Sequence, residues 1–198
     1  MMDDSEKGIG LLGGSFDPVH NGHCSIVSSF LKSGFISEIW ILLTPDPPHK
    51  TEIPITDYQI RIDMLQSAFR GMNRVLIKDI EKRLPRPSYT IRTLKYLKEK
   101  YPGQKFYLCI GGDSLKQFKS WHKWDEILGY CELLVAQRPS AEKVFPDDSI
   151  AAKTHYVVHH PMEVSSTEIR ERVSKGKSIS EFVPSAVEKL IKKYNLYR

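Results

Sequence analysis

Short apolar runs alternate with amphipathic stretches along the chain. A continuous apolar run is typical of a strand buried on both faces, and apolar residues three and four apart indicate a helix. The alternation therefore predicts an α/β fold of three layers, with a mainly parallel sheet of about five or six strands in one domain over residues 1–198. The expected strands are residues 9–12, 38–43, 75–77, 105–110, 132–136 and 156–158.

Residues that commonly cap helices precede several amphipathic stretches. Asn21 is expected to cap the first helix, and Thr56 is expected to open a helix over residues 56–70 through a capping box. Ser165 has the same spacing to a glutamate before a later helix. Ser88 is a candidate cap before another helix. Residues 139–153 carry no periodic pattern, and we expect an irregular polar stretch there.

Residues 13–23 form a glycine-rich turn between the first strand and the first helix. Gly13 and Gly14 permit close backbone approach, and the unpaired N–H groups at a helix start favour anions. His20 and His23 lie three residues apart at that start. The stretch lacks the dinucleotide-binding and P-loop fingerprints. Phosphate binding is the leading interpretation, with a zinc site and a purely structural turn as alternatives.

Other polar residues follow the predicted strands, where open α/β sheets bind their ligands. His49 and Lys50 lie in a proline-rich loop, for which a surface turn is the alternative. Asp113 follows the Gly111 turn and is either a helix cap or a ligand for a ribose hydroxyl. Thr90, in the first turn of its predicted helix, offers a hydroxyl and N–H groups to a carboxylate.

The start of the helix after Ser165 is a second candidate anion site. Ser166 and Thr167 offer hydroxyl groups beside the N–H groups of a helix start. Arg170 would lie in the same first turns, and its guanidinium suits phosphate oxygens. By itself the capping-box spacing means only that a helix begins.

Composition narrows the classes of partner. The chain of 198 residues has a formal net charge of +5, but its basic residues are scattered rather than gathered into a stripe. Small phosphorylated substrates explain this charge better than nucleic acid does. The three cysteines are far apart and suit reduced thiols in a cytoplasm. No apolar run suits a signal peptide or a membrane span, so we expect a cytoplasmic protein without a membrane partner.

Two segments carry a family resemblance. Residues 14–23 resemble the G-x-F-D-P-x-H-x-G-H signature of the nucleotidyltransferase superfamily, and residues 165–170 look like its second motif, S-S-T-x-x-R. The two motifs occur in the expected order. Further matches narrow the resemblance to the nicotinate-nucleotide adenylyltransferases, and together they cover nearly the whole chain. These matches are residues 47–50, 88–90 and 110–115 and Trp121.

The resemblance implies a Rossmann-like fold and adenylyl transfer from ATP to nicotinate mononucleotide. The products would be deamido-NAD and pyrophosphate, with Mg²⁺ on the phosphates and no metal ligand assigned to the protein. The implied catalytic residues are His20, His23 and Arg170, which would also contact ATP. The other implied ATP-binding residues are Gly13, Gly14, Ser15, Phe16, Gly111, Asp113, Ser166 and Thr167. The implied acceptor-binding residues are His49, Lys50, Tyr89, Thr90, Trp121 and Arg138.

Two alternatives of function stay open at this point. The acceptor could instead be nicotinamide mononucleotide or another phosphorylated compound such as phosphopantetheine, because the first and last motifs report only the nucleotidyl half of the site. A nucleotide-binding sensor without turnover is the alternative from a different class. The surface carries no clear apolar signature, so the sequence leaves the choice between a monomer and a homo-oligomer open.

Overall fold

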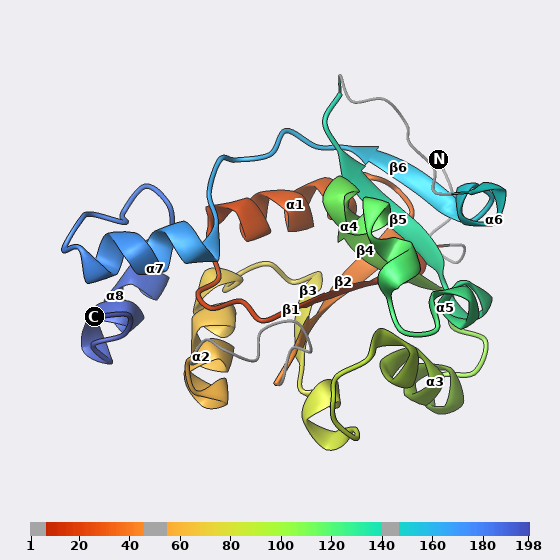
Figure 1. The fold of residues 1–198 in the computed structure, drawn as a ribbon, viewed down its shortest axis with the longest axis horizontal. Helices are drawn as coiled ribbons and strands as arrows, with labels where there is room; N and C mark the ends of the chain where they lie inside the picture. The colour runs from red at the N-terminus through yellow and green to blue at the C-terminus, as the bar shows by residue number, and fades with distance from the viewer. Residues whose placement is uncertain (1–6, 46–54, 140–146) are drawn as a thin grey trace.

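The apolar runs of the sequence form the six strands of one sheet (Figure 1). The computed structural model describes residues 7–45, 55–139 and 147–198. The strand order is β3-β2-β1-β4-β5-β6, and every neighbouring pair is parallel. The predicted α/β fold is confirmed. The strands are β1 (Gly8–Gly14), β2 (Ile36–Leu43), β3 (Val75–Lys78), β4 (Phe106–Gly111), β5 (Glu132–Gln137) and β6 (Thr154–Val158).

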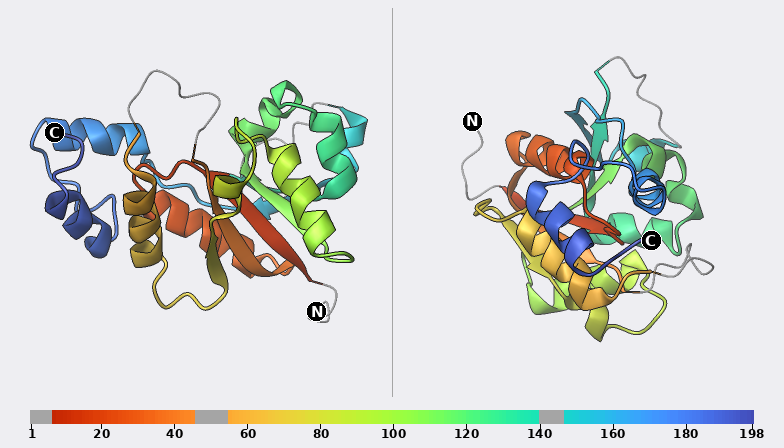
Figure 2. Two further views of the ribbon diagram at one scale, coloured as in Figure 1. Left: turned by 90° about the horizontal axis from the view of Figure 1, so that it is seen from below. Right: turned by 90° about the vertical axis from the view of Figure 1, so that its left-hand side faces the viewer.

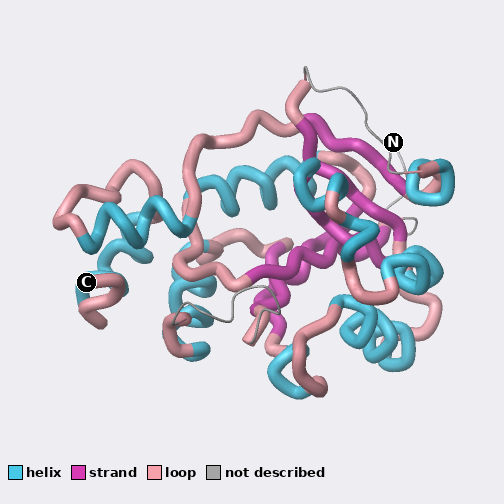
Figure 3. The backbone as a smooth tube through the Cα atoms, viewed as in Figure 1, coloured by secondary structure: helices cyan, strands magenta, loops and turns pink. Residues whose placement is uncertain are grey.

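Helices surround the sheet, as the tube drawing makes plain (Figure 3). They are α1 (Asn21–Lys32), α2 (Tyr58–Ala68), α3 (Thr90–Lys100), α4 (Gly112–Lys116), α5 (Trp124–Tyr130), α6 (Asp148–Ala151), α7 (Ser166–Ser174) and α8 (Ser185–Lys193), with the short 3-10 helices η2 (Ile80–Arg83) and η3 (Phe118–Ser120). Within the described residues, no helix has the length and apolar composition needed to cross a membrane.

The core consists of two apolar clusters, one on each face of the sheet. Alternate residues of a strand point to opposite faces. In β4, Tyr107 and Cys109 belong to one cluster, together with buried residues of α1, α2, α7 and α8. Phe106, Leu108 and Ile110 belong to the other cluster, with buried residues of α3 to α6. The three predicted layers therefore follow from strands that are apolar on both faces.

Two predicted helix starts are wrong by one residue. The N-cap of α1 is His20, while the Asn21 side chain donates to the carbonyl of Glu181 at 2.9 Å. The N-cap of α2 is Asp57, whose carboxylate accepts from the N–H groups of the second and third helical residues. Thr56 does not open this helix because its N–H group donates to Asp17 instead.

Of two predictions for later parts of the chain, one is confirmed and one is wrong in part. Ser165 is the N-cap of α7, and its hydroxyl accepts from the N–H group of Glu168 at 3.1 Å, which confirms the predicted capping. The prediction of an irregular stretch over residues 139–153 is wrong at the end of that range. Asp147 caps α6 there by accepting from the N–H group of Ile150 at 3.0 Å. A helix of four residues is too short to leave a periodic pattern in the sequence.

The C-terminal helices lie together at the end of the molecule away from α5 and α6 (Figures 1 and 2). After α8 in the chain, the hydroxyl of Tyr197 donates to Asp17 Oδ1 at 2.6 Å. Asp17 is only 3% exposed, and its Oδ2 accepts from the N–H group of Thr56 at 3.1 Å. The last turn of the chain is thus tied to the turn that follows β1.

Replacing Tyr197 with phenylalanine is expected to destabilise the protein by about 1–3 kcal/mol, because the buried Asp17 carboxylate loses a hydrogen bond that water cannot replace. Urea unfolding followed by circular dichroism measures this loss. Tyr194→Phe is the matched control. Tyr194 is 38% exposed, and its change should stay within about 0.5 kcal/mol. Equal stability of both variants would contradict the assignment.

Candidate active site

A cavity of about 1000 Å³ lies at the carboxyl ends of β1, β2 and β4. The strand order runs outward in both directions from the β1–β4 pair, which makes this pair the topological switch point of the sheet. Ligands of open α/β sheets bind at such a point, in the crevice outside the strand ends. The sheet therefore places the cavity where a substrate is expected.

The cavity brings together many of the residues predicted to form the site. From the nucleotide-binding set, its walls include Gly13, Gly14, Ser15, Phe16, His23, Gly111 and Ser166. From the acceptor-binding set, they include Tyr89, Thr90 and Trp121. His20, Asp113, Arg138, Thr167 and Arg170 are not among its lining residues. The predicted His49 and Lys50 lie outside the described residues.

The turn after β1 is shaped by close packing of its own residues. Phe16 is 3% exposed and has a φ of 46°, in the left-handed region. A Cβ on Gly14 would lie 3.0 Å from the Phe16 ring, so glycine is what lets the ring fold back over the turn. The edge of this ring meets the His23 ring, with centroids 4.9 Å apart. The turn thereby holds one imidazole at the cavity wall.

The two imidazoles lie against each other, with ring centroids 3.7 Å apart. The backbone N–H of His20 donates to Nδ1 of His23 at 3.2 Å. A Cβ on Gly22 would lie 3.0 Å from Nδ1 of His20 and 3.0 Å from Cγ1 of Val164. Glycine at this position therefore lets the His20 ring pack closely beneath the segment that leads into α7.

His20 is a neutral imidazole at neutral pH. Its side chain is 7% exposed, and burial lowers its pKa to about 4. Buried Nδ1 has no hydrogen-bond partner among the described residues. A neutral imidazole keeps one N–H donor. At this helix start, His20 can therefore serve as a hydrogen-bond donor but not as a fixed positive charge.

Sequence reasoning missed Arg61, whose side chain is hydrogen-bonded to the turn after β1. The Arg61 side chain is 1% exposed and donates to the carbonyls of Ser15, Thr44 and Thr56 at 2.9, 2.9 and 2.8 Å. Burial lowers the pKa of Arg61, and the charge of Asp17 opposes that shift. A signal existed in the sequence, because position 61 lies on the apolar side of the amphipathic pattern of α2.

The second motif is bonded to the first. The hydroxyl of Ser166 donates to the carbonyl of Pro18 at 2.9 Å. Arg170 donates from Nη1 to the carbonyl of Asp17 at 2.8 Å and from Nη2 to the Thr167 hydroxyl at 3.2 Å. Two segments about 150 residues apart are thus held in one arrangement, as the residue numbers of these bonds show.

Two predicted residues lie at more open positions. Asp113 is in the first turn of α4, where its side chain is 98% exposed and pairs with Lys116 at 3.4 Å. Arg138 is exposed and follows β5. Neither side chain is placed among the cavity walls, although Gly111 and Ser114 on either side of Asp113 are.

The side of the cavity with the predicted acceptor-binding residues is rich in aromatic rings. Tyr89 is the N-cap of α3, so Ser88 is not the cap that was considered. The Tyr89 ring stacks on His122, with centroids 4.2 Å apart and planes at 27°. The Trp121 ring packs against the Phe118 ring, with centroids 5.6 Å apart. Flat rings of this kind are suited to hold a heterocycle by stacking.

Glu81 is the only Asp, Glu, Lys or Arg among the described residues that line the cavity. It lies in η2, is 7% exposed and accepts a hydrogen bond from Thr93 at 3.2 Å. Burial raises its pKa, against smaller opposing effects from the side chains of Thr44 and Thr93. Sequence reasoning treated this segment as a charged connection, because no periodic pattern marks one buried carboxyl there.

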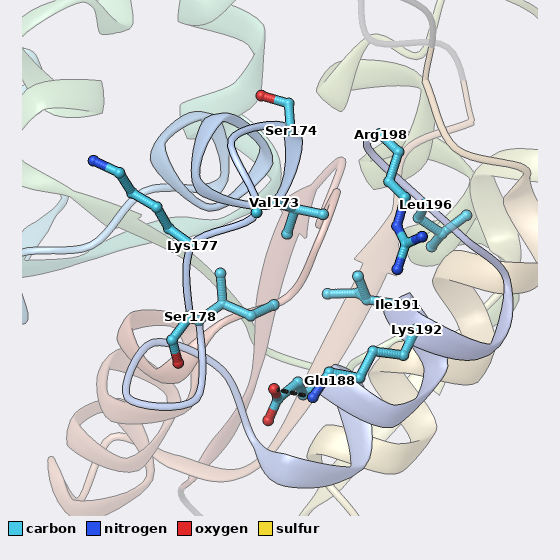
Figure 4. A pocket seen from close by; sticks show the side chains of 11 residues that line it. Val173, Ser174, Lys177, Ser178, Glu188, Ile191, Lys192, Leu196 and Arg198 are labelled. Atoms are coloured by element: carbon cyan, nitrogen blue, oxygen red, sulfur yellow. Dashed lines mark ion pairs between the residues drawn. The ribbon is translucent and has the colours of Figure 1, made fainter.

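A second cavity of about 630 Å³ lies between α7 and α8 (Figure 4). Its wall includes Ile191 and Leu196, and Glu188 pairs there with Lys192 at 2.6 Å. Figure 4 shows Lys177 and Ser178 on the opposite side. None of the predicted site residues that the structure describes lines this cavity. The larger cavity at the strand ends is therefore the candidate active site.

Comparison with known proteins agrees with this geometry. The model of the cytidylyltransferase-like family matches residues 11–172. A relative from Shouchella clausii (strain KSM-K16), named as a probable nicotinate-nucleotide adenylyltransferase, is 38% identical over 192 residues, covering 96% of this chain and 97% of its own. A relative of the same name from Christiangramia forsetii is 34% identical over 190 residues, covering 96% and 98%. The chain belongs to the nicotinate-nucleotide adenylyltransferase family.

The fold of this family member also matches solved structures. The nicotinic acid mononucleotide adenylyltransferase of Plasmodium falciparum, solved in complex with NaAD, superposes with a TM-score of 0.80 at 23% identity, covering 96% of this chain and 97% of the other. The predicted Rossmann-like fold is thereby confirmed. The family match ends within α7, so Tyr197 and its bond to Asp17 lie outside the matched range.

The buried His20 predicts a pH dependence of stability. Its pKa is about 4 in the folded protein and 6.5 when exposed, so between these values the unfolded chain binds the proton and folding loses stability as the pH falls. Above about pH 6.5 the contribution is fully present. In urea unfolding at a series of pH values, His20→Gln should lose less stability than the wild type on acidification. Parallel losses in both proteins would refute a depressed pKa.

Proposed function

We propose that this member of the nicotinate-nucleotide adenylyltransferase family transfers the adenylyl group of ATP to nicotinate mononucleotide, giving deamido-NAD and pyrophosphate in NAD biosynthesis. The observation that carries the proposal is the single cavity of about 1000 Å³ that has the first-motif turn on one wall and an aromatic pocket on another. Two substrates that react with each other must occupy one such space.

The chemistry requires no nucleophilic side chain. An oxygen of the acceptor's phosphate attacks the α-phosphorus of ATP, the bond to the bridging oxygen breaks, and pyrophosphate leaves with the electron pair. The protein contributes by holding the two anions in line and by offering donors to oxygens that gain charge. Residues of the cavity walls can make both contributions.

On the nucleotide side, we assign the ATP phosphates to the start of α1. The turn at Gly13 and Gly14 allows close backbone approach, and His23 lines the cavity. His20 and His23 would donate to phosphate oxygens, with Ser166, Thr167 and Arg170 holding the leaving pyrophosphate. Arg170 has two donors engaged by Asp17 and Thr167, and its guanidinium has five N–H donors in all.

Asp113 and the glycine turn before it complete the nucleotide side. We assign a ribose hydroxyl to Asp113, which is consistent with its exposed carboxylate in the first turn of α4. Ser15, Phe16 and Gly111 line the same cavity and would pack against the nucleotide.

On the acceptor side, we assign the pyridine ring to Trp121 and its carboxylate to the start of α3. Thr90 is the first residue of that helix, where N–H groups are unpaired and favour an anion. Tyr89 lines the cavity beside it. His49, Lys50 and Arg138 remain predicted acceptor contacts, outside the set of described residues that line the cavity.

Mg²⁺ would enter with the nucleotide. It prefers oxygen ligands and binds phosphates readily. The described residues contain no group of three or more His, Cys, Asp or Glu side chains that could hold a metal ion, and the Asp17 carboxylate is already engaged by Thr56 and Tyr197. The donors of the described residues thus do not form a cage for Mg²⁺, and we assign no ligand from the chain and no step to it.

We also propose that the protein works in the cytoplasm. Its three cysteines are unpaired, and Cys109 and Cys131 are buried thiols whose pKa values burial raises. Unpaired buried thiols suit a reducing compartment. The choice between a monomer and a homo-oligomer stays open.

The proposal predicts which acceptor supports turnover. Incubated with ATP, Mg²⁺ and one acceptor at a time, the protein should release pyrophosphate faster with nicotinate mononucleotide than with nicotinamide mononucleotide or phosphopantetheine. A coupled pyrophosphate assay measures the three rates. Faster release with another acceptor would reassign the substrate, and nucleotide binding without any release would indicate a sensor.

The two imidazoles predict large losses of turnover. His23→Ala and His20→Ala should each lower kcat by about 10² to 10³, the size seen when one charge-stabilising donor is removed. Steady-state kinetics with saturating substrates measure the effect, and circular dichroism checks that each variant is folded. His160→Ala, at an exposed position after β6, is the control and should keep the wild-type rate. Near-normal kcat in both imidazole variants would refute their role.

A further inference from the structure

The acceptor wall is the side of the cavity that includes Tyr89, Thr90 and Trp121, where we assign the acceptor. It contains two buried polar atoms that have no hydrogen-bond partner among the described residues. They are Oε2 of Glu81 and Oγ of Ser88, and both residues line the cavity. An unsatisfied buried polar group costs about 1–3 kcal/mol, so such groups are uncommon unless a water, an ion or a ligand supplies the partner. Both atoms lie close in sequence to Tyr89 and Thr90, where the acceptor ring is assigned.

Glu81 is held firmly at one of its two oxygens. Oε1 accepts from the Thr93 hydroxyl at 3.2 Å. Glu81 is 7% exposed, in the 3-10 helix between β3 and α3. The side chain is therefore held by a residue of α3, and one oxygen remains for another partner.

The surroundings favour a neutral carboxyl. No Lys or Arg is among the described residues that line the cavity, and the proposed substrates would add further negative charge. Burial raises the pKa of Glu81, and a nearby anion raises it more. With the Thr93 hydroxyl donating to Oε1, the proton of a neutral carboxyl is placed on Oε2.

We propose that Glu81, as a neutral carboxylic acid, is a specificity-determining residue that donates from Oε2 to the ring carboxylate of the acceptor. This inference rests on the proposed function. A carboxylate has two oxygens, so one can accept from Glu81 while the other accepts from an N–H group at the start of α3. A hydrogen bond to an ionised acceptor is about twice as strong as one to a neutral amide. Glu81 would therefore favour nicotinate over nicotinamide mononucleotide.

The test compares two substitutions of Glu81 with opposite expectations. Glu81→Gln keeps a donor at the same place and should keep the ratio of kcat/KM for nicotinate over nicotinamide mononucleotide within about threefold. Glu81→Leu removes the donor, and the ratio should fall by roughly 10- to 100-fold through a higher KM for nicotinate mononucleotide. The KM for ATP should stay unchanged. Glu99→Gln, at an exposed position in α3, is the matched control.

The outcomes separate this inference from its rivals. A wild-type protein that fails to use nicotinate mononucleotide would refute the proposed function itself. A working wild type whose ratio stays constant in Glu81→Leu, with both acceptors slowed equally, would show that Glu81 only supports the fold. Equal loss of the ratio in both Glu81 variants would also overturn the inference, because the glutamine retains a donor.

A spectroscopic test keeps the inference falsifiable if Glu81→Leu does not fold. The wild-type protein at neutral pH should show the infrared absorption of one neutral carboxyl group, and Glu81→Gln should lack it while Glu99→Gln retains it. On addition of nicotinate mononucleotide without ATP, this band should shift because the carboxyl gains a hydrogen-bond acceptor. Absence of the band from the wild type would mean that Glu81 is ionised and would overturn the inference.

Discussion

The buried guanidinium of Arg61 is the interaction on which the arrangement of the site depends. It connects three backbone carbonyls, from the turn after β1, the end of β2 and the start of α2. An ion as buried as this one is tolerated only when its donors are satisfied. Removing any one of the three segments would leave the charge short of partners. The first motif can therefore be a rigid turn although its own residues include two glycines and little regular structure.

The described walls of the cavity offer mostly neutral groups. Among the described residues that line it, the donors are backbone N–H groups, hydroxyls, the Gln117 amide, the Trp121 indole and the imidazoles of His23 and His122. Neutral donors can be buried at less cost than ammonium groups, and helix starts orient several of them at once. The net positive charge of the protein therefore lies mostly outside this cavity. A site of this kind can exclude water and still receive phosphates, provided that the donors are held in place beforehand.

The sequence predicts the sheet well, and it predicts several residues of the turn after β1 that line the cavity, because both leave regular patterns. Apolar runs mark strands, and two motifs mark the turns around His23 and Ser166. Arg61 and Glu81 escaped prediction for a different reason. The pattern of α2 places position 61 on the apolar side, but it does not say whether a charged side chain there is buried, and the loop composition around Glu81 records nothing of its burial. The helix starts at His20 and Asp57 were off by one residue because neighbouring polar groups had competing partners in distant segments.

Thr44 shows how the sheet itself relates the two half-sites. Its N–H group donates to the carbonyl of Gly14 at 2.9 Å, its carbonyl accepts from Arg61 at 2.9 Å, and its side chain acts to lower the pKa of Glu81. The register of the β1–β2 pair, with Gly14 beside Leu43, fixes where Thr44 can lie. Transfer between two bound substrates tolerates misplacement of only about 1 Å. The parallel register thus sets the distance between the turn after β1, where we propose that ATP binds, and the Glu81 side of the cavity, where we propose that the acceptor binds.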